Sequence, residues 1–331
     1  MPEVSMIMPL FNKARYLSDA LESVMAQTFS DFELIIIDDG SDDHGFEIAS
    51  EYAEKDKRFR VYSIENHGVS HARNMGMACA EGKYITFMDA DDTVHPSFID
   101  NMYTCLQKSQ ADIVISGIIK HRDGVVRGEM AYSRTGLFSM DEILTDFASE
   151  QKRCGIFGSC VAKMFPRELA NGIQFDEKLN LAEDFDFYLR LYAKAQMVYC
   201  DDKLYYYYLQ ETENSSVQVA DEQIDYFGQL QISVRYRNFL NEKKAYRGVN
   251  EKIVSEQITN YLFLSLFYCP QERFAARFKE LRMIHQEQKL ELLPRGVRQN
   301  AVLLFFRWNM CTMLRCMISV YKGVQRRMRR A

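Results

Sequence analysis

The chain has 331 residues, of which 47% are hydrophobic and 26% charged, and its net charge is −5 at pH 7. This composition excludes an intrinsically disordered chain, and the length predicts one large domain with an appendage. The eight cysteines include no C-x-x-C pair, so we expect reduced thiols and neither a disulfide framework nor a zinc site. The first residues, MPEVSMIMPLF, have no basic segment before a short apolar run, which predicts a cytoplasmic protein.

Strand and helix signals alternate through the first half of the chain. VSMIM at 4–8 is a short apolar run, and apolar residues then recur at helical spacing from 16 to 26. The pattern continues with strands expected at 32–38, 59–64, 84–88 and 112–116 and with helices expected at 45–55, 70–80 and after Pro96. Near-continuous apolar strands between amphipathic helices predict an α/β fold, with a mostly parallel sheet covered by helices on both faces.

The signals weaken after about residue 120. We expect a loop or hairpin at 124–128, helices at 139–150 and 183–195, one or two strands at 198–209, and helical segments from about 221 to 286. The pattern therefore predicts an α/β region followed by a helical C-terminal region.

Acidic residues follow a predicted strand at 84–88. In open α/β sheets ligands bind beyond the carboxyl ends of the strands, so residues at these ends are site candidates. Asp89 and Asp91 form a D-x-D pair, and carboxylate oxygens suit Mg²⁺ or Mn²⁺, which take one or two protein carboxylates together with water and substrate phosphates. The alternative is that these residues cap the next helix or lie in a solvated turn.

A second acidic pair, Asp38 and Asp39, ends a neighbouring strand. Two such pairs at one edge of a sheet repel each other unless a cation or a donor-rich ligand, such as a nucleobase with its ribose, offsets them. A plain D-G-S turn is the alternative interpretation.

The segment ENHGVSHARNMG at 65–76 supplies a cation near the same edge. Gly68 allows close backbone approach, and Ser70 is expected to cap the helix that follows. Arg73 lies near the start of that helix, where anions are favoured and a guanidinium can bind a diphosphate with two hydrogen bonds. The alternative is that Arg73 is a surface ion-pair partner.

Four motifs, in this order and spacing, resemble glycosyltransferase family two, the inverting sugar transferases with the GT-A fold. They are VSMIMPLFN, IIIDDGSDD, NHGVSHARNMG and GKYITFMDADD. The resemblance is close over about 4–117 and looser to about 217. It implies a catalytic domain at 1–217 and a helical C-terminal region at 218–331. It implies a nucleoside-diphosphate sugar as donor, most often a uridine one, and Mn²⁺ or Mg²⁺ as cofactor.

The resemblance also implies roles for single residues. Pro9 and Phe11 would pack the uracil ring, and Asp39 would bond the base. Arg73 would approach the nucleotide. Of the D-x-D pair, Asp89 would face the ribose or support the metal site, and Asp91 would be the metal ligand.

Two further segments carry candidate residues. LAEDFDFYLRLY at 181–192 resembles the family segment whose aspartate acts as base, which makes Asp184 the candidate catalytic residue. The alternative is that Glu183 and Asp184 stabilise the positive end of a helix. Lys163, in CVAKMF, matches a position that could face the diphosphate or the acceptor, and a solvated lysine is the alternative. The segment YYYYLQETENSSV lacks the arginine or histidine that relatives often carry there, which leaves the acceptor side open.

The implied activity is that of a metal-dependent, inverting hexosyltransferase. Asp184 would take the proton from an acceptor hydroxyl, while a metal at Asp91 and the cation of Arg73 neutralise the departing diphosphate. The acceptor would be a saccharide or lipid-linked saccharide in the assembly of a cell-surface polysaccharide or glycoconjugate. Processive members of the family carry Q-x-x-R-W, which this sequence lacks, so we expect one sugar per acceptor.

A basic segment ends the sequence, with nine basic residues and no acidic one from Pro294 onward. On one continuous helix, a sector of about 100° would hold the basic residues Arg307, Arg315, Lys322, Arg326 and Arg329. Such a helix suits the interface of an anionic membrane, which predicts a peripheral location on the inner face of the cell membrane. A core-packing helix with a solvated basic end is the alternative. No motif for nucleic-acid binding accompanies the charge, and a homo-oligomer is left open.

Two other activities are compatible with parts of the pattern. A sugar nucleotidyltransferase would need a glycine-rich, arginine-containing phosphate loop after the first strand, and MPLFNKARY lacks it. A catalytically silent partner, which binds nucleotide or membrane within an assembly complex, would not need Asp89, Asp91 and Asp184 all to be present.

Overall fold

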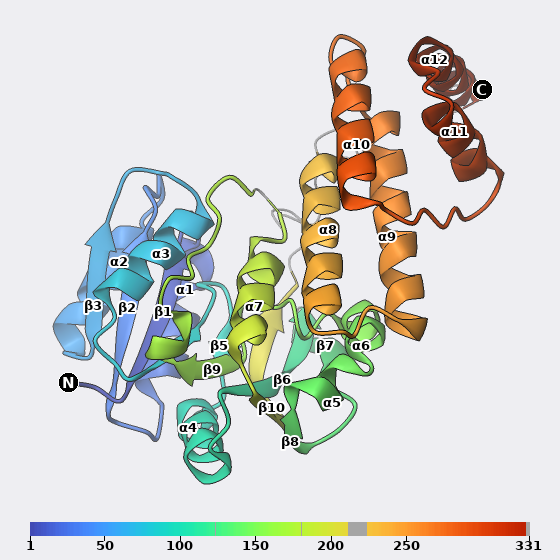
Figure 1. The fold of residues 1–331 in the computed structure, drawn as a ribbon. Coiled ribbons are helices and arrows are strands. Elements are labelled where there is room, and N and C mark those ends of the chain that lie inside the picture. Colours follow the sequence, from blue (N-terminus) through green and yellow to red (C-terminus); the bar gives the residue numbers. More distant parts are fainter. Residues whose placement is uncertain (123, 180, 211–223, 329–331) are drawn as a thin grey trace. The chain divides into compact units, whose positions relative to one another are not determined.

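Figure 1 shows the protein as a computed structural model that describes residues 1–122, 124–179, 181–210 and 224–328, the side chains of 323–328 excepted. The chain divides into two compact units, Met1–Ser215 and Ser216–Ala331. The predicted boundary after residue 217 lies outside the described residues.

The first unit is built on one ten-stranded sheet with the order β3-β2-β1-β4-β9-β6-β10-β5, in which β7 pairs with β6 and β8 with β10. The strands are β1 (Val4–Leu10), β2 (Phe32–Asp38), β3 (Phe59–Ser63), β4 (Tyr84–Phe87), β5 (Thr93–Val94), β6 (Ile113–Arg122), β7 (Val125–Met130), β8 (Gly136–Ser139), β9 (Lys163–Pro166) and β10 (Met197–Leu209). β1 is parallel to β2 and β4, β2 is parallel to β3, and β6 is parallel to β10. The predicted α/β fold is confirmed.

Three strands of the sheet, β5, β8 and β9, were not expected from the sequence. β9 runs antiparallel between β4 and β6 and so joins the two parallel parts. Its four residues are too few to show a period, and the hydrophobic pattern therefore gives no strand signal here.

Helices cover both faces of the sheet. Those of the first unit are α1 (Ala14–Met25), α2 (Gly45–Lys55), α3 (Val69–Cys79), α4 (Phe98–Ser109), α5 (Met140–Leu144), α6 (Phe147–Cys154) and α7 (Glu183–Lys194), with a 3₁₀ helix at Arg167–Ala170. In β4, Tyr84 lies edge-on to Tyr103 of α4, whereas Phe87 lies edge-on to Phe187 of α7. Residues 84 and 87 point to opposite faces of a strand, so α4 and α7 lie on opposite sides (Figure 1).

Helix α3 packs unusually close to the sheet. A Cβ at Gly76 would lie 2.3 Å from Cγ2 of Ile7 in β1, so only glycine permits this approach. The predicted cap by Ser70 is wrong, because α3 begins at Val69 after Gly68 and has no side-chain cap hydrogen bond. Arg73, one turn before Gly76, is thereby carried into the buried layer at the end of the strands.

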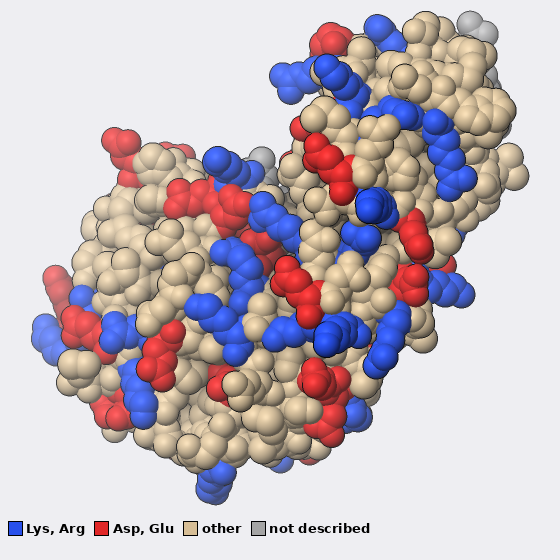
Figure 2. Space-filling model, in the orientation of Figure 1, with Lys and Arg blue, Asp and Glu red and all other residues tan. Residues whose placement is uncertain are grey.

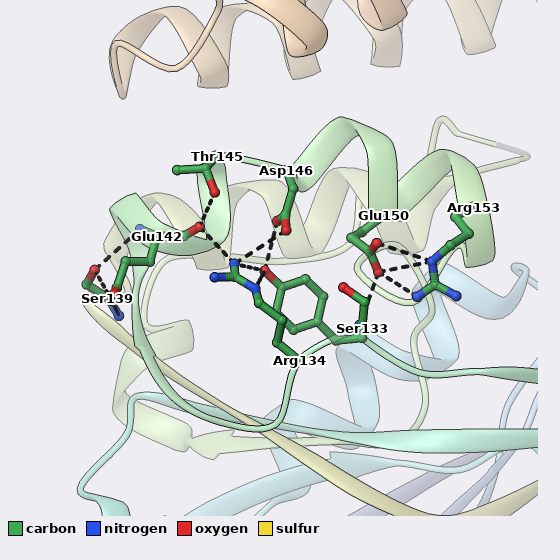
Figure 3. Close-up of polar contacts among 9 residues, drawn as sticks. Ser133, Arg134, Ser139, Glu142, Thr145, Asp146, Glu150 and Arg153 are labelled. Atoms are coloured by element: carbon green, nitrogen blue, oxygen red, sulfur yellow. Dashed lines mark hydrogen bonds and ion pairs between the residues drawn. The ribbon is translucent and has the colours of Figure 1, made fainter.

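The helix predicted at 139–150 is divided into α5 and α6. A capping box starts α5, in which Ser139 and Glu142 each accept the backbone N–H of the other. Asp146 lies between the two helices, and its carboxylate is 3.4 Å from the guanidinium of Arg134; Figure 3 shows this pair. These contacts pair the polar groups of Arg134, Ser139, Glu142 and Asp146 with one another. We therefore assign these residues a structural role.

The second unit is helical, as predicted. Its helices are α8 (Tyr226–Glu242), α9 (Gly248–Phe267), α10 (Phe274–Gln288), α11 (Val297–Arg307) and α12 (Cys311–Met328). Within the described ranges no helix is long and apolar enough to cross a membrane.

The prediction of one continuous basic helix is wrong. α11 ends at Arg307, Asn309 has a φ of 59°, and a new helix starts at Cys311. Arg307 therefore does not share a helical face with Arg315 and Lys322. The other two residues of the predicted sector are not covered, since the side chain of Arg326 and all of Arg329 lie outside the described part of the chain.

Candidate active site

The carboxyl ends of β1, β2 and β4 meet at one edge of the sheet. The register pairs Leu10 of β1 with Asp38 of β2. The N–H of Asp39 donates to the carbonyl of Leu10 (2.8 Å), and that of Met88 donates to the carbonyl of Ile7 (3.0 Å). The acidic segments after β2 and β4 therefore flank the end of β1, as the parallel pattern predicted.

One buried guanidinium joins three acidic side chains at this edge. Arg73 is 4% exposed. Its Nη1 lies 2.5 Å from Oδ1 of Asp184 and 3.1 Å from Oε1 of Glu183, and its Nη2 lies 3.2 Å from Oδ1 of Asp89. The alternative prediction of a surface ion pair is wrong, because the pair is buried.

The charges of this cluster control the proton affinity of Asp184. Burial raises the pKa of Asp184 to about 7, the positive charge of Arg73 opposes the rise, and the negative charges of Glu183 and Asp89 add to it. The Asp184 side chain keeps 26% of its exposure and so remains accessible. A carboxylate with a pKa near neutrality can accept a proton from a substrate at physiological pH.

Burial by itself disfavours the charged form of Arg73 and would lower its pKa. The negative charge of Asp184 and of the groups around it nevertheless raises the Arg73 pKa well above its usual value. The guanidinium is therefore a permanent cation, and it holds the start of α7 against the loop after β4.

Two alanines in a strained backbone conformation precede predicted site residues. Ala182, directly before Glu183 and Asp184, has a φ of 62°, and Ala162, directly before Lys163, has a φ of 58°. A Cβ makes this left-handed region unfavourable, by about 1–2 kcal/mol per residue. Such outliers gather at functional sites, which supports a functional reading of both segments.

Asp92 has a structural environment. It is fully buried, its Oδ2 accepts a hydrogen bond from the Tyr206 hydroxyl (2.6 Å), and its Oδ1 accepts one from the Leu209 N–H (2.8 Å). The same Tyr206 hydroxyl accepts the N–H of Asp89 (3.1 Å). Asp92 and Tyr206 thus fix the acidic loop to β10.

Asp91 lies closer to solvent and has a cation of its own. Its side chain is 17% exposed, and its Oδ2 lies 2.5 Å from Nζ of Lys13 at the start of α1. Burial and the charge of Asp89 raise the pKa of Asp91, and Lys13 opposes the rise. The alternative of a helix cap is wrong for this loop, since β5 follows it and not a helix.

Lys163 reaches the site region through β9. It is fully buried, so the alternative of a solvated lysine is wrong. Its amino group donates to the carbonyl of Ser159 and lies 4.5 Å from the ring centroid of Tyr188. Burial lowers the Lys163 pKa to about 7, and the negative charge of Asp184 opposes this shift.

The remaining predicted residues surround the end of β1. Asp39 is buried, and its two carboxylate oxygens accept the N–H groups of His67 and Gly68, each at 2.8 Å. It therefore fixes the loop that leads into α3. Pro9 lies within β1, and Phe11, just beyond that strand, keeps 44% of its surface exposed.

A divalent cation at this edge of the sheet would need oxygen ligands, and the acidic side chains there are the candidates. Among the described residues there is no group of three or more His, Cys, Asp or Glu side chains that could hold a metal ion. Asp92 has both oxygens engaged, and Asp89 faces Arg73. Asp91 keeps 17% of its side chain exposed and pairs with Lys13, which fits a cation whose other positions are filled by water and substrate phosphates.

Comparison with known proteins identifies the family of the chain. The family described as Glycosyl transferase family 2 matches residues 5–169, a range that includes Arg73, Asp89, Asp91 and Lys163. The chain belongs to this family. It is accordingly a glycosyltransferase, and Asp184 lies just beyond the matched range.

Individual relatives match about two thirds of the chain. The glycosyltransferase GlyG of Streptococcus pneumoniae is 29% identical over 62% of this chain and 70% of its own length. The uncharacterized glycosyltransferase EpsJ of Bacillus subtilis is 32% identical over 66% of this chain and 64% of its own length. The minor teichoic acid biosynthesis protein GgaB of B. subtilis is 32% identical over 68% of this chain but only 25% of its own length.

A solved structure extends the likeness to both units. The 1–349 fragment of TarS from S. aureus, crystallised with UDP-GlcNAc, matches 98% of this chain and 92% of the fragment with a TM-score of 0.64 and 20% identity. At this identity the match shows a shared fold, the GT-A fold followed by a helical region.

Sequence reasoning missed two residues of the site, Lys13 and Tyr206. Lys13 follows β1 in FNK, at the same strand end as Phe11, and its basic character there was the available signal. Tyr206 is one of four consecutive tyrosines, and only the pairing of β10 with β6 and β5 decides which of them points to the acidic loop.

We predict that Arg73→Met destabilises the first unit by about 3–5 kcal/mol, because three carboxylates would lose their buried cation. Urea unfolding followed by circular dichroism measures the effect. Arg15→Met, at an exposed position of α1, is the matched control and should change stability by less than about 0.5 kcal/mol. Equal stability of the two variants would show that the cluster does not need Arg73.

Proposed function

We propose that the protein transfers a hexose from a UDP-sugar to a hydroxyl of a saccharide or lipid-linked saccharide, with inversion at the anomeric carbon. The observation that carries the proposal is the environment of Asp184. This carboxylate stays accessible at the carboxyl edge of the sheet, its pKa is about 7, and Arg73 fixes its position. A general base at neutral pH needs these three properties.

The donor site is proposed at the end of β1. Phe11 presents an exposed ring for a flat base, beside Pro9 in the same strand end. Asp39 retains acceptor capacity, because each carboxylate oxygen that binds one amide has a further lone pair. The shared fold with TarS, a protein crystallised with UDP-GlcNAc, supports a uridine donor.

A divalent cation, Mn²⁺ or Mg²⁺, is proposed to be held by Asp91 together with the donor. When bound, it would supply positive charge to the diphosphate leaving group. Lys13 now neutralises Asp91, so the ammonium group must share or leave this carboxylate when a cation binds. Once displaced, Lys13 remains at the start of α1 and can offer its charge to the same diphosphate.

The proposed reaction is a single displacement. Asp184 removes the proton of the acceptor hydroxyl as its oxygen forms a bond to the anomeric carbon. The bond from that carbon to the diphosphate oxygen breaks, and the electron pair leaves with the diphosphate. Because attack and departure occur on opposite faces, the configuration inverts, and much of the rate enhancement comes from holding the two substrates in line.

Arg73 has a different part in this proposal from the one that the motif implied. Its guanidinium is enclosed by Asp89, Glu183 and Asp184, so its contacts are with these carboxylates. We propose that Arg73 orients Asp184 and limits the rise of its pKa. Lys163, buried behind the same cluster, is proposed to add positive charge near Asp184.

The acceptor is proposed from the relatives. GgaB is named for minor teichoic acid biosynthesis, which supports a role in assembling a cell-surface polymer. A catalytically silent partner is disfavoured by the accessible, near-neutral carboxylate of Asp184, which a binding protein would not need.

We predict that Asp184→Asn retains UDP binding but lowers transfer by at least about 10²-fold, because the amide cannot accept the proton. Asp91→Asn should instead abolish the dependence of UDP binding on Mn²⁺. Calorimetry with UDP, with and without Mn²⁺, and a panel of UDP-sugars assayed for transfer and slow hydrolysis separate the two effects. Asp141→Asn, at an exposed position of α5, is the control. Normal turnover by Asp184→Asn would remove the assignment of the base.

The pH dependence follows from the pKa of Asp184, which burial raises to about 7. Only the ionised carboxylate accepts a proton, so kcat/KM should be constant above this pKa and fall about tenfold per pH unit below it. Initial rates between pH 5 and 9 with a saturating metal concentration test this. A profile with no acidic limb in this range would contradict the assignment.

Lys13→Met should tighten the binding of Mn²⁺ to the nucleotide-free protein by about threefold to tenfold, because Asp91 would lose its competing ammonium group. Electron paramagnetic resonance of free Mn²⁺ gives the affinity without any turnover. Lys57→Met, at an exposed position, is the matched control and should leave the affinity unchanged. Weaker binding by Lys13→Met would mean that Lys13 assists the cation and does not compete with it.

A further inference from the structure

The last two helices of the second unit carry positive charge without carboxylates of their own. From Pro294 to the end the sequence has nine basic residues and no acidic one. Within the described part of the chain, none of Arg298, Arg307 and Arg315 has a carboxylate at ion-pair distance. Arg298 lies against the ring of Tyr321, and Arg315 donates to the side-chain carbonyl of Gln271. These contacts position the cations and leave their charge uncompensated.

The same two helices expose large apolar side chains. Leu304 and Trp308 lie one turn apart at the end of α11, and Met313 and Val320 lie two turns apart on α12. Trp308 is 67% exposed and Val320 is 68% exposed. We call these four residues the α11–α12 apolar face.

The apolar face is separate from the core of the second unit. The core side of the two helices is already filled by buried residues, namely Val302, Leu303, Phe306, Leu314 and Ile318. The four exposed residues are therefore additional apolar surface that the unit itself does not cover. Figure 2 shows the end of the molecule that carries α11 and α12 with Lys and Arg among uncharged side chains.

We propose that the α11–α12 apolar face, together with the arginines of the same two helices, binds the surface of an anionic phospholipid bilayer. Apolar side chains enter the boundary between headgroups and acyl chains, and basic side chains beside them meet the negative headgroups. Tryptophan favours this depth, because its ring is apolar and its indole N–H is polar. Charge decides between this partner and a second copy of the chain, since two copies would bring like-charged arginines together. This inference is independent of the proposed function.

The test uses the full chain and the fact that Trp308 is its single tryptophan. Its fluorescence therefore reports this face alone. Vesicles of phosphatidylcholine with about 30% phosphatidylglycerol should shift the emission to shorter wavelength, and vesicles of phosphatidylcholine alone should bind at least about tenfold more weakly. Sedimentation with the vesicles gives the affinity, and high salt should reverse most of the binding.

Two variants separate the apolar and the charged contributions. Leu304→Ser/Met313→Ser keeps the tryptophan and should lower vesicle affinity at least tenfold. Arg307→Glu/Arg315→Glu should remove the preference for anionic lipid. Val249→Ser/Met283→Ser changes two exposed apolar residues of α9 and α10 and is the matched control, expected to bind as the unaltered protein does. Circular dichroism checks that each variant is folded.

Three results would overturn the proposal. The first is no vesicle binding, and the second is equal binding to neutral and anionic vesicles. The third is a fluorescence shift that appears without lipid and grows with protein concentration, which would identify the face as an interface between copies of this chain.

Discussion

The burial of one guanidinium is the interaction on which the site depends. Arg73 lies in the layer where α3 packs on β1, and a charge in such a place is stable only if opposite charges accompany it. Asp89, Glu183 and Asp184 supply them from two other elements. The acidic residues at the strand ends would repel one another, and the positive charges of Arg73 and Lys13 offset this repulsion. The same ion pairs therefore determine both the geometry and the charge balance of the site.

Burial also gives the site two groups with unusual proton affinity. It raises the pKa of the Asp184 carboxyl and lowers that of the Lys163 ammonium, because in both it disfavours the charged form. The two residues lie on α7 and β9. Lys163 directly follows Ala162, and Asp184 lies two residues after Ala182, and both alanines have the left-handed conformation. Backbone strain and burial therefore occur together near Asp184 and Lys163. The packing of the sheet against the aromatic residues of α7 offsets the free-energy cost of both the strain and the burial.

The two units use charge in different ways. In the first unit, basic and acidic groups meet at short distances and fix side chains at the ends of the strands. In the second, Arg298 and Arg315 lie apart from the carboxylates that the structure describes, on the same helices that expose large apolar residues, an arrangement suited to a large charged surface. A sugar transferase whose acceptor is lipid-linked would benefit from both properties in one chain.

Much of this protein follows from its sequence. Alternating apolar runs and helical periods gave the α/β fold, and the polar residues after the strands gave the edge at which the site lies, because parallel strands end on the same side. Motif order supplied the family, with Asp184 as its expected base. The tertiary structure alone decided that Arg73 is buried among three carboxylates, that Lys13 pairs with Asp91, and that β9 places Lys163 in the interior. It also decided the break at Asn309 that separates the basic helices. Periodicity records which face of an element is apolar, but the partners of a side chain come from distant parts of the chain. Arg73 and Asp184 are 111 residues apart, and only the packing of their elements brings these charges together.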